Sequence, residues 1–209
     1  MDTTPIFAEF PKMARLSREI IVTEKIDGSN AQIFIRKLAD NEVMPTDTPI
    51  VAVVGDLLLY AGSRNRSITP GNDNFGFAAW VKANAETLAL LGPGRHFGEW
   101  WGSGIQRGYG LTKGEKRFSL FNTFQWGFLD TVTPEQNPLA GVVRVVPVLY
   151  RGVFDTNAIS TVMERLATLG SVAAPGFMDP EGIVVFHTAA NIGFKKTVKN
   201  DETPKSKQP

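Results

Sequence analysis

The chain has 209 residues, 43% hydrophobic and 21% charged, a composition that suits a folded domain with a sizeable core and excludes a disordered chain. Lysine and arginine number 22 against 21 acidic residues, so a basic surface for a polyanion has to come from local clustering. There is no cysteine, which excludes disulfides, thiolate metal sites and a cysteine nucleophile.

The N-terminus lacks the basic start and apolar core of a signal peptide, and no apolar run approaches membrane-spanning length. We therefore expect a cytoplasmic protein with no membrane partner.

Short apolar and β-branched runs, separated by glycine, proline or polar residues, predict many strands. The predicted strands are residues 20–23, 31–36, 50–54, 57–61, 96–100, 118–128, 182–186 and 192–198. We expect the first two to pair across the polar KIDGSN segment, and 50–54 to form a hairpin with 57–61 at Gly55-Asp56. Residues 142–149 form a further apolar run of the buried type.

Two segments have the apolar spacing of helices. In the first, Ala78, Val81, Ala85, Leu88 and Leu91 repeat at three- and four-residue intervals, and Gly92-Pro93-Gly94 ends the pattern. The second is 156–169, with a stripe of Ile159, Val162, Met163, Leu166 and Leu169, either Asp155 or Thr156 as its N-cap, and Gly170 at its end.

Many short strands with two helices predict an α+β domain with antiparallel sheets and flanking helices. We expect one domain over residues 1–199, a disordered tail over 200–209 and no separate C-terminal domain.

Lys25 is the candidate for chemistry in the KIDGSN segment. It ends a predicted strand and precedes a tight turn at Gly28, and Asp27 lies on the same side of an extended chain. Taken alone, this arrangement is more often a surface ion pair than a nucleophile.

Four further polar clusters adjoin predicted strands. They are residues 63–66 (SRNR), 97–102 (FGEWWG), 180–185 (PEGIVV) and 194–199 (FKKTVK). Each alone is explained equally well by solvated charges at the rim of a sheet. Their combination with Lys25 is what indicates a site.

In this order, the segments resemble the nucleotidyltransferase motifs of ATP-dependent DNA and RNA ligases and mRNA capping enzymes. The run from Lys25 to Gly28 resembles the nucleophile motif of that superfamily, lysine-any-aspartate-glycine. FGEWWG resembles the third motif, residues 118–122 (FSLFN) the aromatic strand that follows it, EGIVV the fourth and FKKTVK the fifth. The stretch FGEWWGSGIQ at 97–106, and Ser63-Arg64 followed by Phe75-Gly76, resemble the phage RNA ligases that seal nicks in a double strand.

The resemblance implies that Lys25 attacks the α-phosphate of ATP, that AMP passes to a nucleic-acid 5′-phosphate, and that a 3′-hydroxyl then displaces AMP. Attack requires a neutral amine, whereas free lysine has a pKa of about 10.4, so nearby cations and a metal would favour the reactive form. The expected partners are ATP and an RNA end or nicked duplex, with Mg²⁺, or alternatively Mn²⁺, as the cofactor.

The resemblance also assigns roles to individual residues. Lys25, Arg64, Lys195 and Lys196 would be catalytic, and Glu24, Ile26, Asp27, Gly28, Glu99 and Phe121 would bind the nucleotide. Glu99 would hold the ribose hydroxyls, Glu24 would lie near the adenine, Phe121 would stack on it, and Glu181 would hold the metal. From strand alternation, Trp100 and Trp101 are expected to face opposite ways, with one in the core and the other a candidate for contact with nucleic acid.

Three features depart from the family pattern. Asn122 replaces the usual aspartate, the spacing of the fifth motif leaves open which of Lys195 and Lys196 acts, and we expect no C-terminal domain of the kind that ligases usually add. The alternatives are a minimal ATP-dependent DNA ligase, more distantly a capping guanylyltransferase, or a degenerate nucleotide-binding module.

Overall fold

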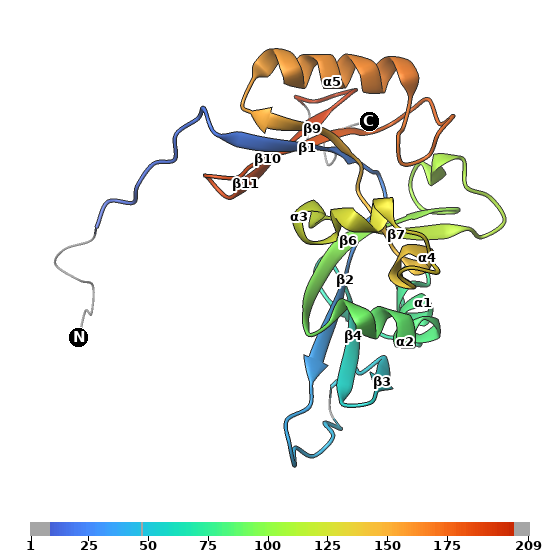
Figure 1. The fold of residues 1–209 in the computed structure, drawn as a ribbon. Helices are drawn as coiled ribbons and strands as arrows, with labels where there is room; N and C mark the ends of the chain where they lie inside the picture. Colours follow the sequence, from blue (N-terminus) through green and yellow to red (C-terminus); the bar gives the residue numbers. More distant parts are fainter. Residues whose placement is uncertain (1–8, 47, 203–209) are drawn as a thin grey trace.

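The structure, a computed structural model that describes residues 9–46 and 48–202, has two separate sheets, of which the smaller lies above the larger in Figure 1. Its α+β class with antiparallel sheets and few helices confirms the prediction. None of the helices in the part of the chain that the structure describes is long and apolar enough to cross a membrane.

The small sheet has the order β11-β10-β1-β9 and is antiparallel throughout. Its strands are β1 (Glu19–Lys25), β9 (Val148–Val153), β10 (Gly182–His187) and β11 (Ile192–Thr197). Helix α5 (Thr156–Leu169) lies across one face, where Val162 and Leu166 pack on Ile20 and Ile183. Asp155 is the N-cap of α5, since its carboxylate accepts a hydrogen bond from the Asn157 amide at 2.8 Å, and Gly170 follows the last turn at φ 83°. Leu169 is exposed, so the predicted apolar stripe ends one turn earlier.

The large sheet has the order β3-β4-β2-β6-β7-β8, with β5 also paired to β4. Its strands are β2 (Ser29–Lys37), β3 (Ala52–Val54), β4 (Leu57–Ser63), β5 (Ser67–Ile68), β6 (Gly94–Gly102), β7 (Lys116–Leu120) and β8 (Arg144–Val145). One face is buried under helices α1 (Phe77–Ala83), α2 (Ala85–Leu88) and α4 (Leu139–Val142). The hairpin of β3 and β4 turns at Gly55, as predicted.

The predicted pairing of the first two strands is wrong. β1 belongs to the small sheet and β2 to the large one, because the turn between them carries the chain from one sheet to the other. Ile26 in this turn is buried with Trp101 and Tyr109 in a third small core, which fixes the direction of the crossing.

Residues 142–149 do not form one strand either. β8 lies in the large sheet and β9 in the small one, and Pro147, which has no amide hydrogen to donate to a sheet, separates them. This second crossing lies beside the first, since the Glu24 amide donates to the Pro147 carbonyl at 2.9 Å.

Two other predicted elements are shorter than expected. The strand expected at 118–128 ends at Leu120, because the Asn122 side chain accepts from the Gln125 amide and starts helix α3 (Thr123–Trp126). The structure also has three short 3₁₀ helices, η1 (Ala89–Leu91), η2 (Gly108–Gly110) and η3 (Gly127–Thr131). The helix expected from Ala78 to Leu91 is interrupted at Asn84 and continues as α2 and η1.

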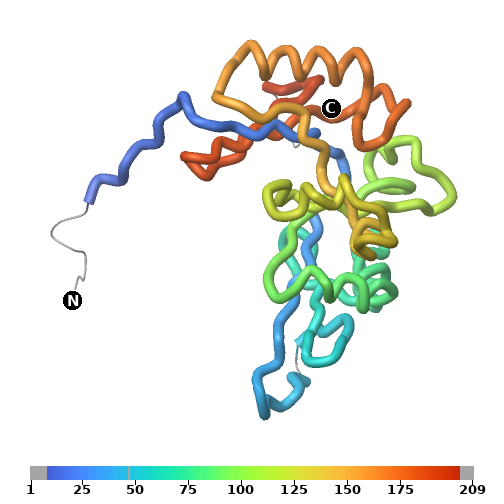
Figure 2. Tube along the Cα trace, viewed as in Figure 1, coloured from blue at the N-terminus to red at the C-terminus, as the bar shows by residue number. Residues whose placement is uncertain are grey.

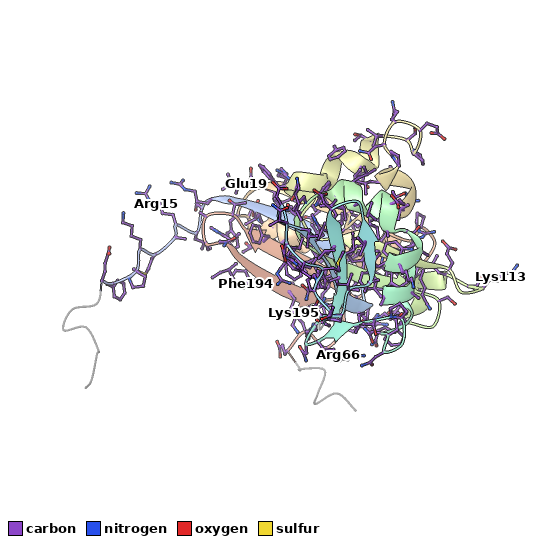
Figure 3. All side chains as sticks on the ribbon, turned by 90° about the horizontal axis from the view of Figure 1, so that it is seen from below. Arg15, Glu19, Arg66, Lys113, Phe194 and Lys195 are labelled. Carbon is purple, nitrogen blue, oxygen red and sulfur yellow. The ribbon has the colours of Figure 1, made fainter. Side chains whose placement is uncertain are left out.

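Both ends of the described chain leave the small sheet. Residues 9–18 form an arm that extends away from the body (Figure 2), and Arg15 on it lies at the opposite end of the molecule from Lys113 (Figure 3). At the other end, Asn200–Glu202 form a turn in which Asp201 accepts from the Thr197 amide at 2.7 Å. Residues 203–209 of the predicted tail lie outside the described residues.

Candidate active site

A cavity of about 1050 Å³ lies between the two sheets, next to both chain crossings. Its walls include Lys25, Thr23 and Val184 from the small sheet, and Asn30 and Glu99 from the large one. Lys25, Arg64, Glu24, Ile26, Asp27, Gly28, Glu99 and Phe121, all predicted site residues, line it. Segments far apart in the sequence thus meet at one hollow.

Lys25 is the last residue of β1, and its side chain is 23% exposed. Strand alternation places it on the same face as Ile21 and Thr23, which also line the cavity. Its amine forms an ion pair with Glu181, with 2.5 Å between Nζ and Oε2, and Glu181 is 2% exposed. A buried carboxylate thus fixes the position of the amine at the cavity wall.

Gly28 allows the turn after Lys25 to pack closely on β6. A Cβ atom there would lie 2.5 Å from the Trp100 carbonyl oxygen and 2.8 Å from the Trp101 Cβ. The Gly28 amide donates to Glu99 Oε1 at 3.0 Å. The glycine of the motif therefore lets the turn reach the large sheet.

Glu99, on β6, is buried and accepts hydrogen bonds from both neighbouring segments. Besides the Gly28 amide, the Asn30 side chain donates to Oε2 at 2.9 Å. Asn30 in turn accepts from Arg64 Nε at 2.9 Å, so the predicted catalytic arginine is connected to Glu99 through one amide. Burial raises the pKa of Glu99 to about 7, against the opposing effects of Asn30, Lys25 and the Gly28 amide.

The strand register distinguishes Lys195 from Lys196. Lys195 is opposite Val184, which lines the cavity, whereas Lys196 is opposite Ile183, which packs under α5. Paired residues share a face of an antiparallel sheet, so Lys195 is on the face of Lys25. Lys196 pairs with Asp201 on the other face, at 3.3 Å. Both lysines are on the outer strand of the small sheet, where Figure 3 labels Phe194 and Lys195 side by side.

Glu24 points away from Lys25 and is tied to the loop after α5. Its carboxylate accepts from the Ser171 hydroxyl at 2.5 Å and from the amides of Val172 and Ala173 at 2.8 and 2.9 Å. The carboxylate thus holds the loop, and Glu24 contributes to the cavity wall beside its strand neighbours.

The aromatic residues of the site divide into exposed and buried groups. Phe121 is 43% exposed at the cavity, a position open to a ligand. Trp100 and Trp101 do face opposite ways, but both are buried, Trp100 against Phe77 and Trp101 against Tyr109. The expectation that one of them is available to nucleic acid is therefore wrong.

The family assignment follows from the sequence as a whole. A family model described as "RNA ligase" matches residues 18–200, which is most of the chain. The chain belongs to the RNA ligase family. None of the curated proteins matches it.

Solved structures show the same fold as this RNA ligase family member. An apo variant of Naegleria gruberi RNA ligase is 18% identical over 93% of this chain, with a TM-score of 0.57. Other variants of that enzyme, solved with ATP and Mn and with AMP and Mn, are also 18% identical, with TM-scores of 0.54 and 0.57. This chain spans 57%, 57% and 56% of those chains.

Tyr109 and Arg107 support the site of this RNA ligase family member, although sequence reasoning did not select them. The buried Tyr109 hydroxyl accepts from the Asp27 amide at 2.9 Å and from the Glu181 amide at 3.4 Å, so it connects the segments that carry Lys25 and its partner. Arg107 forms ion pairs with Asp27 at 3.0 Å and with Asp179 at 2.9 Å. In the sequence, the feature that marks these two residues is the glycine-rich segment GIQRGYG. Within it, Gln106 and Tyr109 have positive φ, as glycines often do.

The residues that the structure describes contain no group of three or more histidine, aspartate and glutamate side chains placed to hold a metal ion. Glu181 and Glu99 are the carboxylates beside Lys25. This donor set suits Mg²⁺, which proteins often bind through one or two carboxylates together with substrate phosphates and water.

Proposed function

We propose that the protein is an ATP-dependent RNA ligase that acts through a covalent lysyl-AMP at Lys25. The observation that carries the proposal is the Lys25 amine, held by the buried Glu181 on the wall of a cavity large enough for a nucleotide. Membership of the RNA ligase family supports it.

In the first step the lone pair of Lys25 Nζ forms a bond to the α-phosphorus of ATP, and the bond to pyrophosphate breaks. The amine gives up a proton first, and Glu181 Oε2 is an acceptor at hydrogen-bond distance. Arg64 and Lys195, both cationic, would offset charge on the phosphates as pyrophosphate leaves. Lys196 is the less suitable assistant, because it is on the other face of β11.

In the second step an oxygen of an RNA 5′-phosphate attacks the lysyl-AMP phosphorus, and the nitrogen–phosphorus bond breaks, which restores Lys25. In the third, a 3′-hydroxyl oxygen attacks that 5′-phosphate and AMP leaves. We propose RNA ends as the substrate, and the resemblance of residues 97–106 to the nick-sealing phage enzymes adds a nicked duplex as the alternative.

The nucleotide would lie with its ribose hydroxyls at Glu99 and its base on Phe121, where stacking contributes roughly 1–3 kcal/mol. Ile26, Asp27 and Gly28 form the turn that closes this end of the cavity, and Glu24 contributes its strand to the wall. Residues 1–199 would form the nucleotidyltransferase domain.

Mg²⁺, or Mn²⁺, would be held by Glu181, because its carboxylate adjoins the amine and is the kind of oxygen ligand that Mg²⁺ prefers. The bound cation would supply positive charge that offsets the phosphates and favours the neutral form of a neighbouring amine.

Covalent labelling tests the proposal. The purified protein is incubated with Mg²⁺ and α-labelled ATP, with α-labelled GTP in parallel, and then denatured. We expect label from ATP to stay on the chain, to be lost in Lys25→Ala and to persist in Lys37→Ala, a control lysine that pairs with Asp56 on the large sheet.

A protein free of bound AMP that forms no adduct with either nucleotide would contradict the enzyme proposal and favour a degenerate nucleotide-binding module. An adduct from GTP alone would favour a capping enzyme. Nicked RNA compared with nicked DNA then separates the RNA ligase from a minimal DNA ligase, since the RNA ligase should seal the RNA nick faster.

A further inference from the structure

The large sheet has one packed face and one open face. On β2, Ala31, Ile33 and Ile35 are buried in the main core, while the alternate residues Asn30, Gln32, Phe34 and Arg36 are half-buried on the other side. The register places Tyr60 of β4 and Arg95 of β6 directly opposite Phe34. Polar and aromatic side chains thus follow the open face along its central strand.

A second hollow, of about 400 Å³, lies on this open face. Its floor includes Phe34 and Tyr60, whose rings stack with centroids 5.6 Å apart, and the Arg95 guanidinium lies 4.2 Å from the Phe34 ring. Pro45, Thr48 and Pro49 form part of its wall. Gly62 lets the Gln32 side chain lie flat against β4, since a Cβ at this position would lie 2.8 Å from the Gln32 Cγ.

This hollow adjoins the active-site cavity at Arg95. Arg95 lines both, and Phe97, two residues further along β6 on the same face, lines the larger one. Along β2 the same face runs from Asn30, bonded to Glu99, to Arg36, a length of about 20 Å at about 3.3 Å per residue. One track therefore leads from the site of Lys25 out across the sheet.

The track carries two arginines, Arg64 at its inner end beside Asn30 and Arg95 at its centre beside Phe34. Within residues 9–46 and 48–202, neither Arg95 nor Arg64 forms an ion pair, and both donate instead to neutral amide oxygens, of Gln32 at 3.2 Å and of Asn30 at 2.9 Å. Arg36, at the outer end, is paired with Glu42 at 2.7 Å. Cations available to phosphates thus lie beside the half-buried rings of Phe34 and Tyr60.

We propose that the open face from Asn30 to Arg36, with Phe34, Tyr60 and Arg95 as its central contacts, binds a single-stranded RNA arm that extends from the end held at Lys25. The proposal rests on the proposed function for the identity of the ligand. Aromatic rings that stack bases, with a cationic groove along the backbone, are the general means by which proteins hold single strands. A cross-strand ring pair by itself would be explained by its contribution to sheet stability. The two arginines that form no ion pair within the described residues, and the contact of this face with the site, indicate a ligand in addition.

Length-dependent binding tests the track. Fluorescence anisotropy with labelled RNAs of two, six and twelve nucleotides, each with a 5′-phosphate, would give the Kd of the wild-type protein and of Phe34→Leu, Tyr60→Leu and Arg95→Ala. Arg165→Ala, on the exposed side of α5, is the control for loss of a charge. Urea unfolding of each variant separates lost binding from lost folding.

We expect the wild-type Kd to fall with RNA length and the two ring variants to lose about tenfold in affinity for the twelve-nucleotide RNA, with little change for the dinucleotide. Arg95→Ala should reduce the slope of log affinity against log salt by about 0.7, the value for one phosphate contact on a single strand. Arg165→Ala should bind as the wild type does. Equal affinity for all lengths, or ring variants that bind every RNA as the wild type does, would overturn the track.

The outcomes also separate this proposal from the ligase function. Phe34→Leu and Tyr60→Leu should form the lysyl-AMP adduct normally, because both rings lie outside the cavity of Lys25. An adduct without length-dependent binding contradicts the track alone, and length-dependent binding without an adduct contradicts only the catalytic proposal. Stronger binding of a blunt duplex than of the single strand would also overturn the track.

Discussion

The two walls of the active-site cavity differ in how their charged groups are held. On the small sheet, Lys25 and Glu181 form a direct ion pair, and Lys195 is on an outer strand. On the large sheet, Glu99 accepts hydrogen bonds from two neutral donors, the Gly28 amide and the Asn30 side chain. The small sheet therefore presents a compensated ion pair, and the large sheet presents a carboxylate whose charge is weakly compensated.

Because of this difference, the relative position of the two sheets determines whether the site is complete. Neither wall is a complete site, and the turn from Lys25 to Gly28 is where they are joined covalently. Three changes, one at the junction and one on each wall, test how far the walls depend on each other.

At the junction, Gly28→Ala should have the largest effect on stability. The added methyl group would overlap the Trp100 carbonyl and the Trp101 Cβ, so we expect a loss of about 3 kcal/mol in the free energy of unfolding. Urea unfolding measures it. Gly127→Ala is the matched control, because no atom lies within 4 Å of a Cβ there and its φ of −57° suits alanine. Equal stability of the two variants would show that the turn does not set the spacing of the sheets.

On the large sheet, Glu99 should make stability depend on pH. Its pKa in the folded state is about 7 against an ordinary value of 4.5, so the folded state retains a proton that the unfolded state releases. Stability from this group is therefore fully present below about pH 4.5 and lost as pH rises to about 7, by about 2–3 kcal/mol. Urea unfolding across this range should show the decline in the wild-type protein and a much flatter profile in Glu99→Gln. A wild-type profile without that decline would mean that the carboxylate is better compensated than its contacts indicate.

On the small sheet, the two neighbouring lysines of β11 should differ. Lys195→Ala removes a cation from the cavity face and should slow formation of the adduct about tenfold, whereas Lys196→Ala removes one from the opposite face and should change the rate less than twofold. Single-turnover labelling with ATP measures both rates. The reverse order would contradict the assignment by strand register.

The sequence allowed the fold class to be predicted, because strand and helix spacing are local patterns, and most of the proposed site residues do line one cavity. The KIDG and EGIVV segments sufficed to place Lys25 and Glu181 at strand ends, whereas Glu99 lies inside β6, three residues before its end. It did not show that β1 and β2 lie in different sheets, because Ile26 and Gly28 determine the crossing through contacts with Tyr109 and Trp100, about 80 residues away.

The helix α3 was missed for a local reason. Phe121, Phe124 and Phe128 were read as part of an aromatic strand, although their spacing of three and four residues is helical and Asn122 is a common N-cap. The roles of Arg107 and Tyr109 could not be inferred, since the partners of a side chain in a glycine-rich segment depend on how the chain folds around it.

The strand order of the small sheet has a consequence for how the protein folds. β1 comes from the start of the chain, and the other three strands of the sheet, of which β9 and β10 pair with it, all come after residue 147. Lys25 and Glu181 are separated by 156 positions, so closing this contact involves a long loop and a high contact order. During synthesis on a ribosome, the large sheet can assemble from consecutive segments before the partners of β1 exist. Until then Ile20 and Val22 of β1 lack the residues of α5 and β10 that cover them in the folded protein. The contact between Lys25 and Glu181 can therefore form only after residue 181 has been synthesised, and until then the apolar side chains of β1 lack the packing that they have in the folded protein.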